Sequence, residues 1–467
     1  MKCLSMFLPI SQPNKSRSFC VNSHLRPKRK LFALSAFVLV STCVSNGQDI
    51  TPKVSRYMDA QVEVNRFNGS ILIAQHEQVL LQKRYGPAAV ATEEQRLLSS
   101  RYRPGSIAKQ FIAAAILQLN EKGKLELQDS VCKHLAKCPN GWDEIKIFNL
   151  LAQTDGIPDL DPSLQPKMAK STTTTSDLLA RLAVRPLEFR PGEKFRYGNS
   201  GYAVLGAVIE EVSGESCLKY LNDHIFIRLG MRETGYDDAG RIARNNPEIP
   251  NSILPSDLDL AVPYSWGRLY STAEDLYRWD RALNSEELLS KPSIASMFTP
   301  YIDGHGFGWV VLKEFDRTLD TSAGGVYLFG SAIRRYAADG VCVIVVSNSD
   351  NADAGRISRD LAAILFGKHY ELPSQHRAID INPATFDFYV GRYQLASDFV
   401  LTVSKEANRL MIQSPNQPKI EIFPESETRF FAKGLDAVVS FIQSPQGKAT
   451  QLVVQQGGRD IPAPRIN

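Results

Sequence analysis

The stretch Ser106-Ile107-Ala108-Lys109, with the residues that follow it to Gly123, decides both the fold and the chemistry expected of this chain. Apolar side chains recur at helical spacing after Lys109 and a glycine ends the pattern, so we predict a helix over residues 110–123. Residues three apart share a helix face, which places Lys109 beside the Ser106 hydroxyl. Ser106 would then lie at the helix N-terminus, where free N–H groups and the helix dipole favour an oxyanion.

Ser106 and Lys109 are therefore a candidate nucleophile and its base. A lysine in apolar surroundings loses its proton more readily, and a neutral amine can accept the proton of a serine hydroxyl. Composition alone would give roughly two such pairs in a chain of this length, so the assignment depends on further motifs.

A second motif, Tyr197-Gly198-Asn199, can supply a proton relay and an amide. A tyrosine next to the cationic Lys109 can pass a proton from the nucleophile to the leaving group. The Asn199 amide can contact both Lys109 and a substrate carbonyl.

A third motif, Ser322-Ala323-Gly324-Gly325, carries the small residues expected where a substrate lies against a strand. Glycines let a substrate backbone approach an edge strand, and the Gly325 N–H could complete an oxyanion hole with the N–H of Ser106. We therefore expect the residues that bind substrate to be Asn199, Ser322, Gly324 and Gly325.

These motifs resemble those of the serine β-lactamase and penicillin-binding-protein superfamily, in particular its class C β-lactamase-like branch, which also contains D-amino-acid peptidases and esterases. The resemblance extends from about residue 53 to about residue 370 and includes the segments 67–74, 150–158, 266–276 and 306–309. It implies that Ser106 is the nucleophile, that Lys109 and Tyr197 transfer protons, and that Asn199 contacts the lysine and the substrate.

The chain departs from the family pattern at the third motif. Ser322 stands where the family usually has lysine or histidine, so a donor or cation that would attract a substrate carboxylate is absent. Leu328 and Arg268 stand where glycines are common, and Arg268 is a candidate to replace the missing charge. Penicillins and peptidoglycan stem peptides carry a carboxylate, so we expect inefficient β-lactam hydrolysis.

The fold expected of residues 48–372 is α+β. The resemblance implies a β-lactamase/transpeptidase-like antiparallel sheet flanked by helices, with a helical lobe and the active site between sheet and lobe. Strands are expected at 70–75, 79–84, 308–312, 326–336 and 341–347, and a closing helix at 357–366. A chain of 467 residues with 43% apolar residues is long enough for a second domain.

We expect that second domain at residues 379–467, after a linker at 373–378. Short strand patterns at regular spacing between residues 388 and 455 predict a small all-β barrel or sandwich, which resembles the lipocalin-like modules appended to such hydrolases. It contains no catalytic constellation. A stabilising module, or one that narrows the cleft, is therefore favoured over a ligand-binding barrel.

Residues 1–47 have the layout of a secretory signal peptide, with basic residues first, the apolar run 31–40 next, and small residues at 45 and 47. We expect cleavage after Gly47 and export to the periplasm or the extracellular space. A membrane anchor is a weaker alternative because the run is shorter than about 18 residues. Lipid attachment at Cys43 is another. Removing the seven basic residues of this leader leaves 47 basic against 50 acidic residues, which gives no basic stripe for nucleic acid.

Cys132 and Cys138 are close in sequence, and export implies an oxidising compartment, so a disulfide is the favoured interpretation. Free thiols and, far less, a metal site are the alternatives. Cys217 and Cys342 occur in apolar patterns and are expected to be buried.

No GxSxG, HExxH or Walker signature occurs, so we expect no cofactor and no metal. The partners expected are a small-molecule or peptide substrate, with no nucleic acid and with membrane contact only through the leader. Among scattered histidines, His305 is the one candidate to border the cleft and compensate for Ser322. Trp309 and Tyr327 are expected to pack, and Asp155 and Asp159 to be turn residues.

Three functions remain open. An exported serine hydrolase that forms a covalent acyl-enzyme on esters or amides of small acyl, D-amino-acid or peptide substrates uses every motif and is favoured. A true β-lactamase or D,D-carboxypeptidase would use the same chemistry, but Ser322 counts against it. A non-catalytic binding protein on the same scaffold is disfavoured because the nucleophile, both proton-transfer residues and Asn199 are all present.

Overall fold

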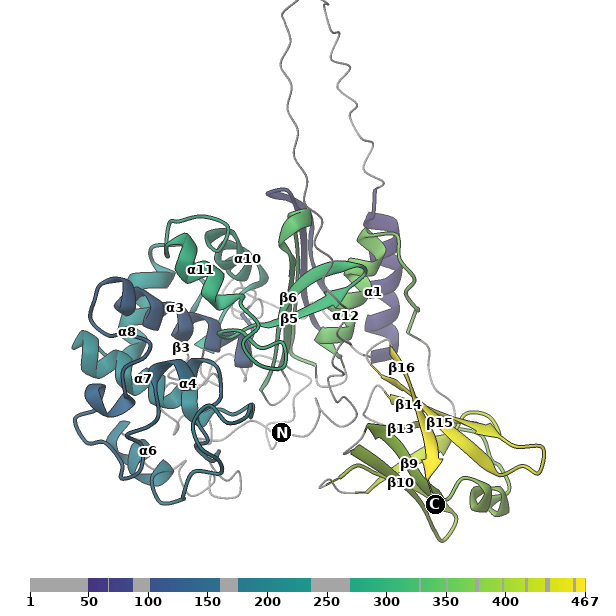
Figure 1. Cartoon of the computed structure of the whole chain (residues 1–467). Coiled ribbons are helices and arrows are strands. Elements are labelled where there is room, and N and C mark those ends of the chain that lie inside the picture. Colours follow the sequence, from purple (N-terminus) through teal and green to yellow (C-terminus); the bar gives the residue numbers. More distant parts are fainter. Residues whose placement is uncertain are drawn as a thin grey trace, which may run out of the picture.

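The computed structural model describes residues 49–65, 67–86, 101–159, 175–236, 269–326, 329–349, 352–373, 378–396, 399–415, 419–432, 437–456 and 459–466. They form an α+β domain followed by a closed β-barrel (Figure 1). The expected leader, residues 374–377 of the expected linker, Arg268, Tyr327 and Leu328 lie outside the described residues. Within the described ranges, no helix is long and apolar enough to cross a membrane.

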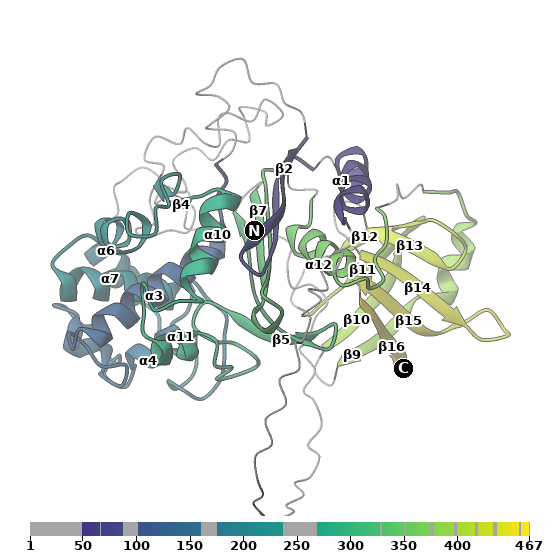
Figure 2. The ribbon, with the colours of Figure 1, turned by 90° about the horizontal axis from the view of Figure 1, so that it is seen from above.

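A six-stranded antiparallel sheet forms the centre of the first domain, in the order β2-β1-β8-β7-β6-β5. Its strands are β1 (Gly69–Gln75), β2 (Gln78–Tyr85), β5 (Val310–Glu314), β6 (Arg317–Val326), β7 (Phe329–Tyr336) and β8 (Val341–Ser347). Every residue of β8 is buried, because helices cover both faces of the sheet (Figure 2). This arrangement confirms the expected α+β fold.

One face of the sheet carries the helical lobe and the other carries the two terminal helices, α1 (Thr51–Asn65) and α12 (Ala354–Leu365) (Figure 2). The helices of the lobe are α3 (Ala108–Glu121), α4 (Ile147–Leu151), α6 (Thr175–Leu182), α7 (Ser200–Ser213), α8 (Cys217–Leu221), α10 (Ala273–Ala282) and α11 (Lys291–Met297). Shorter elements are η1 (Gly105–Ile107), η2 (Val131–His134), η4 (Asn222–Phe226), β3 (Gly235–Tyr236), β4 (Leu269–Tyr270) and, between β7 and β8, η5 (Ala337–Asp339).

The central helix α3 is the helix predicted after Ser106. It is buried on all sides from Ala108 to Leu119, so the lobe is built around it. The chain leaves it through Gly123, whose φ of 66° is the left-handed conformation that favours glycine after a helix.

The strand prediction missed β6, which contains the whole third motif. Residues 320–326 pair with β7 in continuous register, from Asp320 opposite Arg335 to Val326 opposite Phe329. A Ser-Ala-Gly-Gly segment has a low intrinsic preference for strands, so this strand forms through pairing with its neighbour.

The second domain is a closed barrel in the order β10-β11-β12-β13-β14-β15-β16-β9. Its elements are η6 (Pro383–Phe388), β9 (Gly391–Ala396), β10 (Phe399–Glu406), β11 (Arg409–Gln413), β12 (Ile420–Pro424), β13 (Arg429–Ala432), β14 (Ala437–Gln443), β15 (Ala449–Gln456) and β16 (Arg459–Ile466). Eight strands leave an interior just wide enough for side chains. Tyr389, Tyr393, Phe430 and Phe441 are buried there, so the interior resembles a packed core more than a ligand-binding cavity.

The closing strand β16 was not expected, because Pro462 and Pro464 argue against a strand. They pair with β15, opposite Val453 and Gln451. The other edge of β16 pairs with β9 only at its last two residues, Arg465 and Ile466. A proline nitrogen that faces this unpaired stretch breaks no ladder hydrogen bond, which explains how the strand accommodates both prolines.

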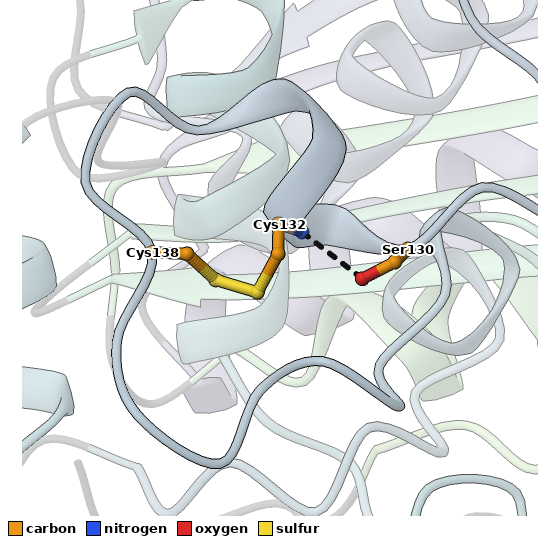
Figure 3. Close-up of a disulfide and its surroundings, with 3 residues drawn as sticks. All are labelled: Ser130, Cys132 and Cys138. Atoms are coloured by element: carbon orange, nitrogen blue, oxygen red, sulfur yellow. Dashed lines mark hydrogen bonds between the residues drawn. A yellow bond between two sulfur atoms is a disulfide. The ribbon is translucent and has the colours of Figure 1, made fainter.

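Cys132 and Cys138 form a disulfide at the surface of the helical lobe, with their Cα atoms 5.0 Å apart (Figure 3). The Cys132 N–H donates to the Ser130 hydroxyl, which caps the short helix η2. Cys217 and Cys342 are both buried free thiols, as expected, and burial raises the pKa of each.

Candidate active site

The nucleophile candidate lies where the sheet meets the helical lobe. Ser106 is in the turn η1, directly before α3, and Lys109 follows within the first turn of that helix. The Lys109 side chain is almost completely buried, and its Nζ lies 3.3 Å from Ser106 Oγ. The i, i+3 spacing therefore brings these two groups together.

The second motif completes a compact cluster around the lysine. Lys109 Nζ lies 2.9 Å from the Tyr197 hydroxyl and 2.7 Å from Asn199 Oδ1. A protonated lysine has three N–H donors, and the three oxygens of Ser106, Tyr197 and Asn199 match them. The Tyr197 hydroxyl in turn donates to Ser106 Oγ at 2.6 Å.

The distances indicate how protons can move in this cluster. Ser106 Oγ is closer to the Tyr197 oxygen than to Lys109 Nζ, so Tyr197 is the more direct proton partner. A positive charge on Lys109 stabilises the negative charge that develops on either oxygen during attack. Tyr197 is 50% exposed, so its hydroxyl is also accessible to a leaving group or to water.

The third motif approaches the nucleophile through its backbone. A Cβ on Gly324 would lie 2.0 Å from the Pro104 oxygen and 2.8 Å from the Ser106 nitrogen, which leaves no room for a side chain. A Cβ on Gly105 would lie 2.9 Å from the Gly325 nitrogen. Both glycines are therefore required for β6 to lie directly against η1.

The register of β5 and β6 shows where the Gly325 N–H points. Their two-residue turn, Phe315 and Asp316, makes Glu314 and Arg317 a hydrogen-bonded pair, and such pairs recur every second residue. Extended along β6, this alternation directs the N–H groups of Ala323 and Gly325 toward the same edge. Because β5 begins only at Val310, opposite Thr321, no strand among the described residues pairs with that edge beside Ser106. The Gly325 N–H is thus available for an oxyanion.

Ser322 faces the helical lobe, as Gly324 does, because alternate strand residues share a face. It is 8% exposed, and its hydroxyl makes no hydrogen bond to another described residue. Arg335, on the neighbouring strand, binds Asp280 at 2.9 Å and also Asn284, so it is already paired. Where the family resemblance implies a cation, this wall therefore has a neutral hydroxyl.

His305 does not supply the missing charge. Its imidazole stacks on Phe195 with ring centroids 3.9 Å apart, and burial lowers its pKa, which favours the uncharged ring. Trp309 is buried and packs against Phe298, as expected for a wall residue.

Sequence reasoning did not identify Gln153 and took Asp159 for a turn residue, whereas both lie in the loop after α4 and bind the backbone around Tyr197. The Gln153 main-chain oxygen accepts the Arg196 N–H at 3.0 Å, and its side-chain oxygen accepts the Gly198 N–H at 2.9 Å. Asp159 Oδ1 accepts the N–H groups of Asn199 and Ser200 at 2.7 and 2.9 Å and so caps helix α7. The polar residues of this loop were the only available signal, since nothing in the sequence pairs it with residues 196–200.

Asp155, in the same loop, has a buried carboxyl group. Its Oδ1 accepts the Ile157 N–H at 2.8 Å, which is the turn contact expected from sequence. Burial raises its pKa to about 7. Its second oxygen lies against Gly201 of α7, where a Cβ would be 2.6 Å away. The Asp155 carboxyl therefore has a pKa near neutral pH and lies against α7, the helix that follows Asn199.

A cavity of about 460 Å³ lies where β7 ends and β8 begins. It is lined by the β1–β2 turn, helix α10 and Arg335. None of the catalytic candidates lines it. Over the described ranges, no group of three or more His, Cys, Asp or Glu side chains is arranged to bind a metal ion.

Comparison with known proteins agrees with this geometry. The family model "Beta-lactamase" matches residues 54–368, and the model "Domain of unknown function (DUF3471)" matches residues 375–463. Penicillin-binding protein 4* of Bacillus subtilis (strain 168) is 28% identical over 437 residues, 85% of this chain and 95% of that protein.

Two solved structures share the fold. The octameric penicillin-binding protein homologue from Pyrococcus abyssi has a TM-score of 0.61 and 24% identity, and the match covers 88% of this chain and 99% of that one. The D-stereospecific amidohydrolase from Streptomyces sp. has a TM-score of 0.56 and 24% identity over 68% of this chain and 99% of that one. The chain therefore belongs to the beta-lactamase family of serine hydrolases, with a small barrel domain at its C-terminus.

Proposed function

We propose that this protein is an exported hydrolase that forms an acyl-enzyme on esters or amides of small acyl, D-amino-acid or peptide substrates, without needing a free carboxylate on the substrate. The observation that carries the proposal is the cation-free recognition wall, Ser322 to Gly325, next to a complete proton-transfer cluster. Export is inferred from the basic and apolar leader at residues 1–47.

In the acylation step Ser106 Oγ forms a bond to the substrate carbonyl carbon, and the phenolate form of Tyr197, paired with protonated Lys109, accepts the Ser106 proton. The oxyanion accepts hydrogen bonds from the N–H groups of Ser106 and Gly325. When the carbonyl carbon loses its alcohol or amine, the leaving group takes the proton back from Tyr197. Water then attacks the ester carbonyl and gives one proton to the same pair, and Ser106 is released with its hydrogen restored.

Main-chain recognition supports an amide or peptide as one class of substrate. The open edge of β6 presents N–H and C=O groups of Ala323 and Gly325, which an extended backbone can pair with as an added strand. The Asn199 amide, whose oxygen accepts a hydrogen bond from Lys109 at 2.7 Å, can use its N–H groups to donate to a substrate carbonyl. The D-stereospecific action named for the Streptomyces structure makes D-amino-acid derivatives the first to test.

The matched test is a D-Ala-D-Ala peptide compared with its C-terminal amide, with cleavage of the same D-Ala-D-Ala bond followed in both. The two differ only in the carboxylate, so the ratio of their kcat/KM values measures how much the site depends on that charge. We expect the neutral form to be hydrolysed at least as efficiently as the free acid. A free acid preferred by about tenfold or more, which is about 1.4 kcal/mol, would instead favour a carboxypeptidase.

A further inference from the structure

Gln153 bonds to both neighbours of the proposed proton-transfer tyrosine. It accepts the Arg196 N–H with its main-chain oxygen and the Gly198 N–H with its side-chain oxygen, at 3.0 and 2.9 Å. One residue therefore fixes the backbone on either side of Tyr197. Gln153 itself is 6% exposed, so both bonds are largely shielded from competing water.

The backbone of Gln153 is in an unfavourable conformation. Its φ is 56°, in the left-handed region that residues with a Cβ rarely adopt. Glycine or asparagine would occupy such a turn position with less strain. A strained residue indicates that its surroundings require it, and here the two bonds to residues 196 and 198 supply the reason.

Tyr197 needs such support because its own packing is limited. Half of its surface is exposed, yet its hydroxyl makes contacts of 2.6 Å to Ser106 and 2.9 Å to Lys109. Small displacements of a reacting group of about 1 Å can cost about 100-fold in rate. The direction of the Tyr197 side chain must therefore be set by the backbone that carries it.

We propose that Gln153 is a positioning residue for acyl transfer, which directs the Tyr197 hydroxyl toward Ser106 and Lys109. The inference rests on the proposed function, since it concerns the proton transfer of that reaction. Asp159 continues the same support by binding the N–H groups of Asn199 and Ser200, but it also caps α7, so its removal would mix positioning with helix stability. Gln153 is the cleaner residue to test.

The test uses Gln153→Met, which keeps the length of the side chain and the main-chain bond to Arg196 but removes the acceptor for Gly198. For a neutral ester we expect kcat, and the rate of Ser106 labelling by a fluorophosphonate, to fall about 10- to 100-fold with KM changed little. Gln153→Glu retains an oxygen acceptor and should recover most of the rate. If Gln153→Met does not fold, Gln153→Asn carries the same prediction, since asparagine tolerates the positive φ but is one carbon shorter.

Thr154→Val is the matched control. It removes a buried hydrogen bond in the same loop, from Asn149 Nδ2 to Thr154 Oγ1 at 3.1 Å, and leaves the contacts of Gln153 intact. It should lower the melting temperature and leave kcat unchanged. A Gln153→Met protein that reacts at the wild-type rate, or a Thr154→Val protein slowed equally, overturns the positioning proposal alone. A wild-type protein whose Ser106 is never labelled overturns the proposed function itself.

Discussion

The two walls of the active site differ in what carries their function. On the helical-lobe wall, side chains carry out the proton transfer and the nucleophilic attack. Ser106, Lys109, Tyr197 and Asn199 form a cluster there with contacts of 2.6–3.3 Å. On the sheet wall, the backbone carries the function, because the glycines at 105 and 324 let β6 lie directly against η1. The chain combines a complete acyl-transfer cluster with a recognition wall, Ser322 to Gly325, whose own residues carry no charge, so catalysis and substrate choice can be tested separately.

The largest effect on turnover within this comparison is expected from Gly324→Ala. The added methyl group would overlap the Pro104 oxygen, so β6 must move away from η1 and carry the Gly325 N–H with it. We expect kcat/KM for a neutral ester to fall about 100-fold or more, together with a lower Tm. The control is Gly330→Ala on the neighbouring strand, where a Cβ would meet its nearest atom at 3.5 Å. A Gly324→Ala enzyme as active as this control would contradict the close contact between the walls.

Ser322→His tests the charge of the sheet wall and should have an intermediate effect. A protonated histidine can form a charge-assisted hydrogen bond with a substrate carboxylate, which contributes about 1.5–3 kcal/mol. We expect turnover of a β-lactam to rise about tenfold relative to turnover of a neutral ester, and to rise more at pH 6 than at pH 8. Equal changes for both substrates would show that position 322 does not control carboxylate recognition.

Asp155→Asn tests the helical-lobe wall and should change turnover least. The pKa of Asp155 is raised to about 7 in the folded protein, above its value of 3.8 in the unfolded chain, so the folded state binds the extra proton between these two values. Its contribution to stability is therefore fully present below about pH 4 and is lost as pH rises through about 7. Asparagine cannot ionise, so the Asp155→Asn protein does not lose stability through this group as pH rises.

Urea unfolding of wild type and Asp155→Asn at pH 5 and pH 8 measures the effect. Relative to wild type, the variant should be more stable at pH 8 than at pH 5 by up to about 3 kcal/mol, the equivalent of the roughly two pH units between pH 5 and the folded pKa. Other buried acids, such as Asp320 and Asp360, have raised pKa values in both proteins and cancel in the difference. Parallel stability curves would mean that Asp155 ionises normally in the fold.

Sequence patterns predicted the parts of the site that depend on local spacing. The Ser106–Lys109 contact follows from one helical turn, and short motifs identified Tyr197, Asn199 and the glycines at 324 and 325. The roles of Gln153 and Asp159 could not be found this way, because both residues bind main-chain N–H groups more than 35 residues further along the chain. Such bonds leave no composition or spacing signal in a single sequence.

The same distinction applies to the fold. The hairpin of β1 and β2 follows from two short apolar runs separated by a turn at His76 and Glu77, and it was predicted within a residue or two. Strands β6 and β16 were missed because glycines in one and prolines in the other mask the pattern. In both, pairing with the adjacent strand overrides the preference of the residues themselves, with β7 for the first and β15 for the second.

The measurement that tests the central claim most directly is the intact mass of the folded protein after brief exposure to a fluorophosphonate, with Ser106→Ala treated in parallel. A serine activated by Lys109 and Tyr197 predicts one covalent adduct on the wild-type protein and none on the variant. An adduct that persists in Ser106→Ala, or its absence from well-folded wild type, would contradict the assignment of Ser106 as an activated nucleophile.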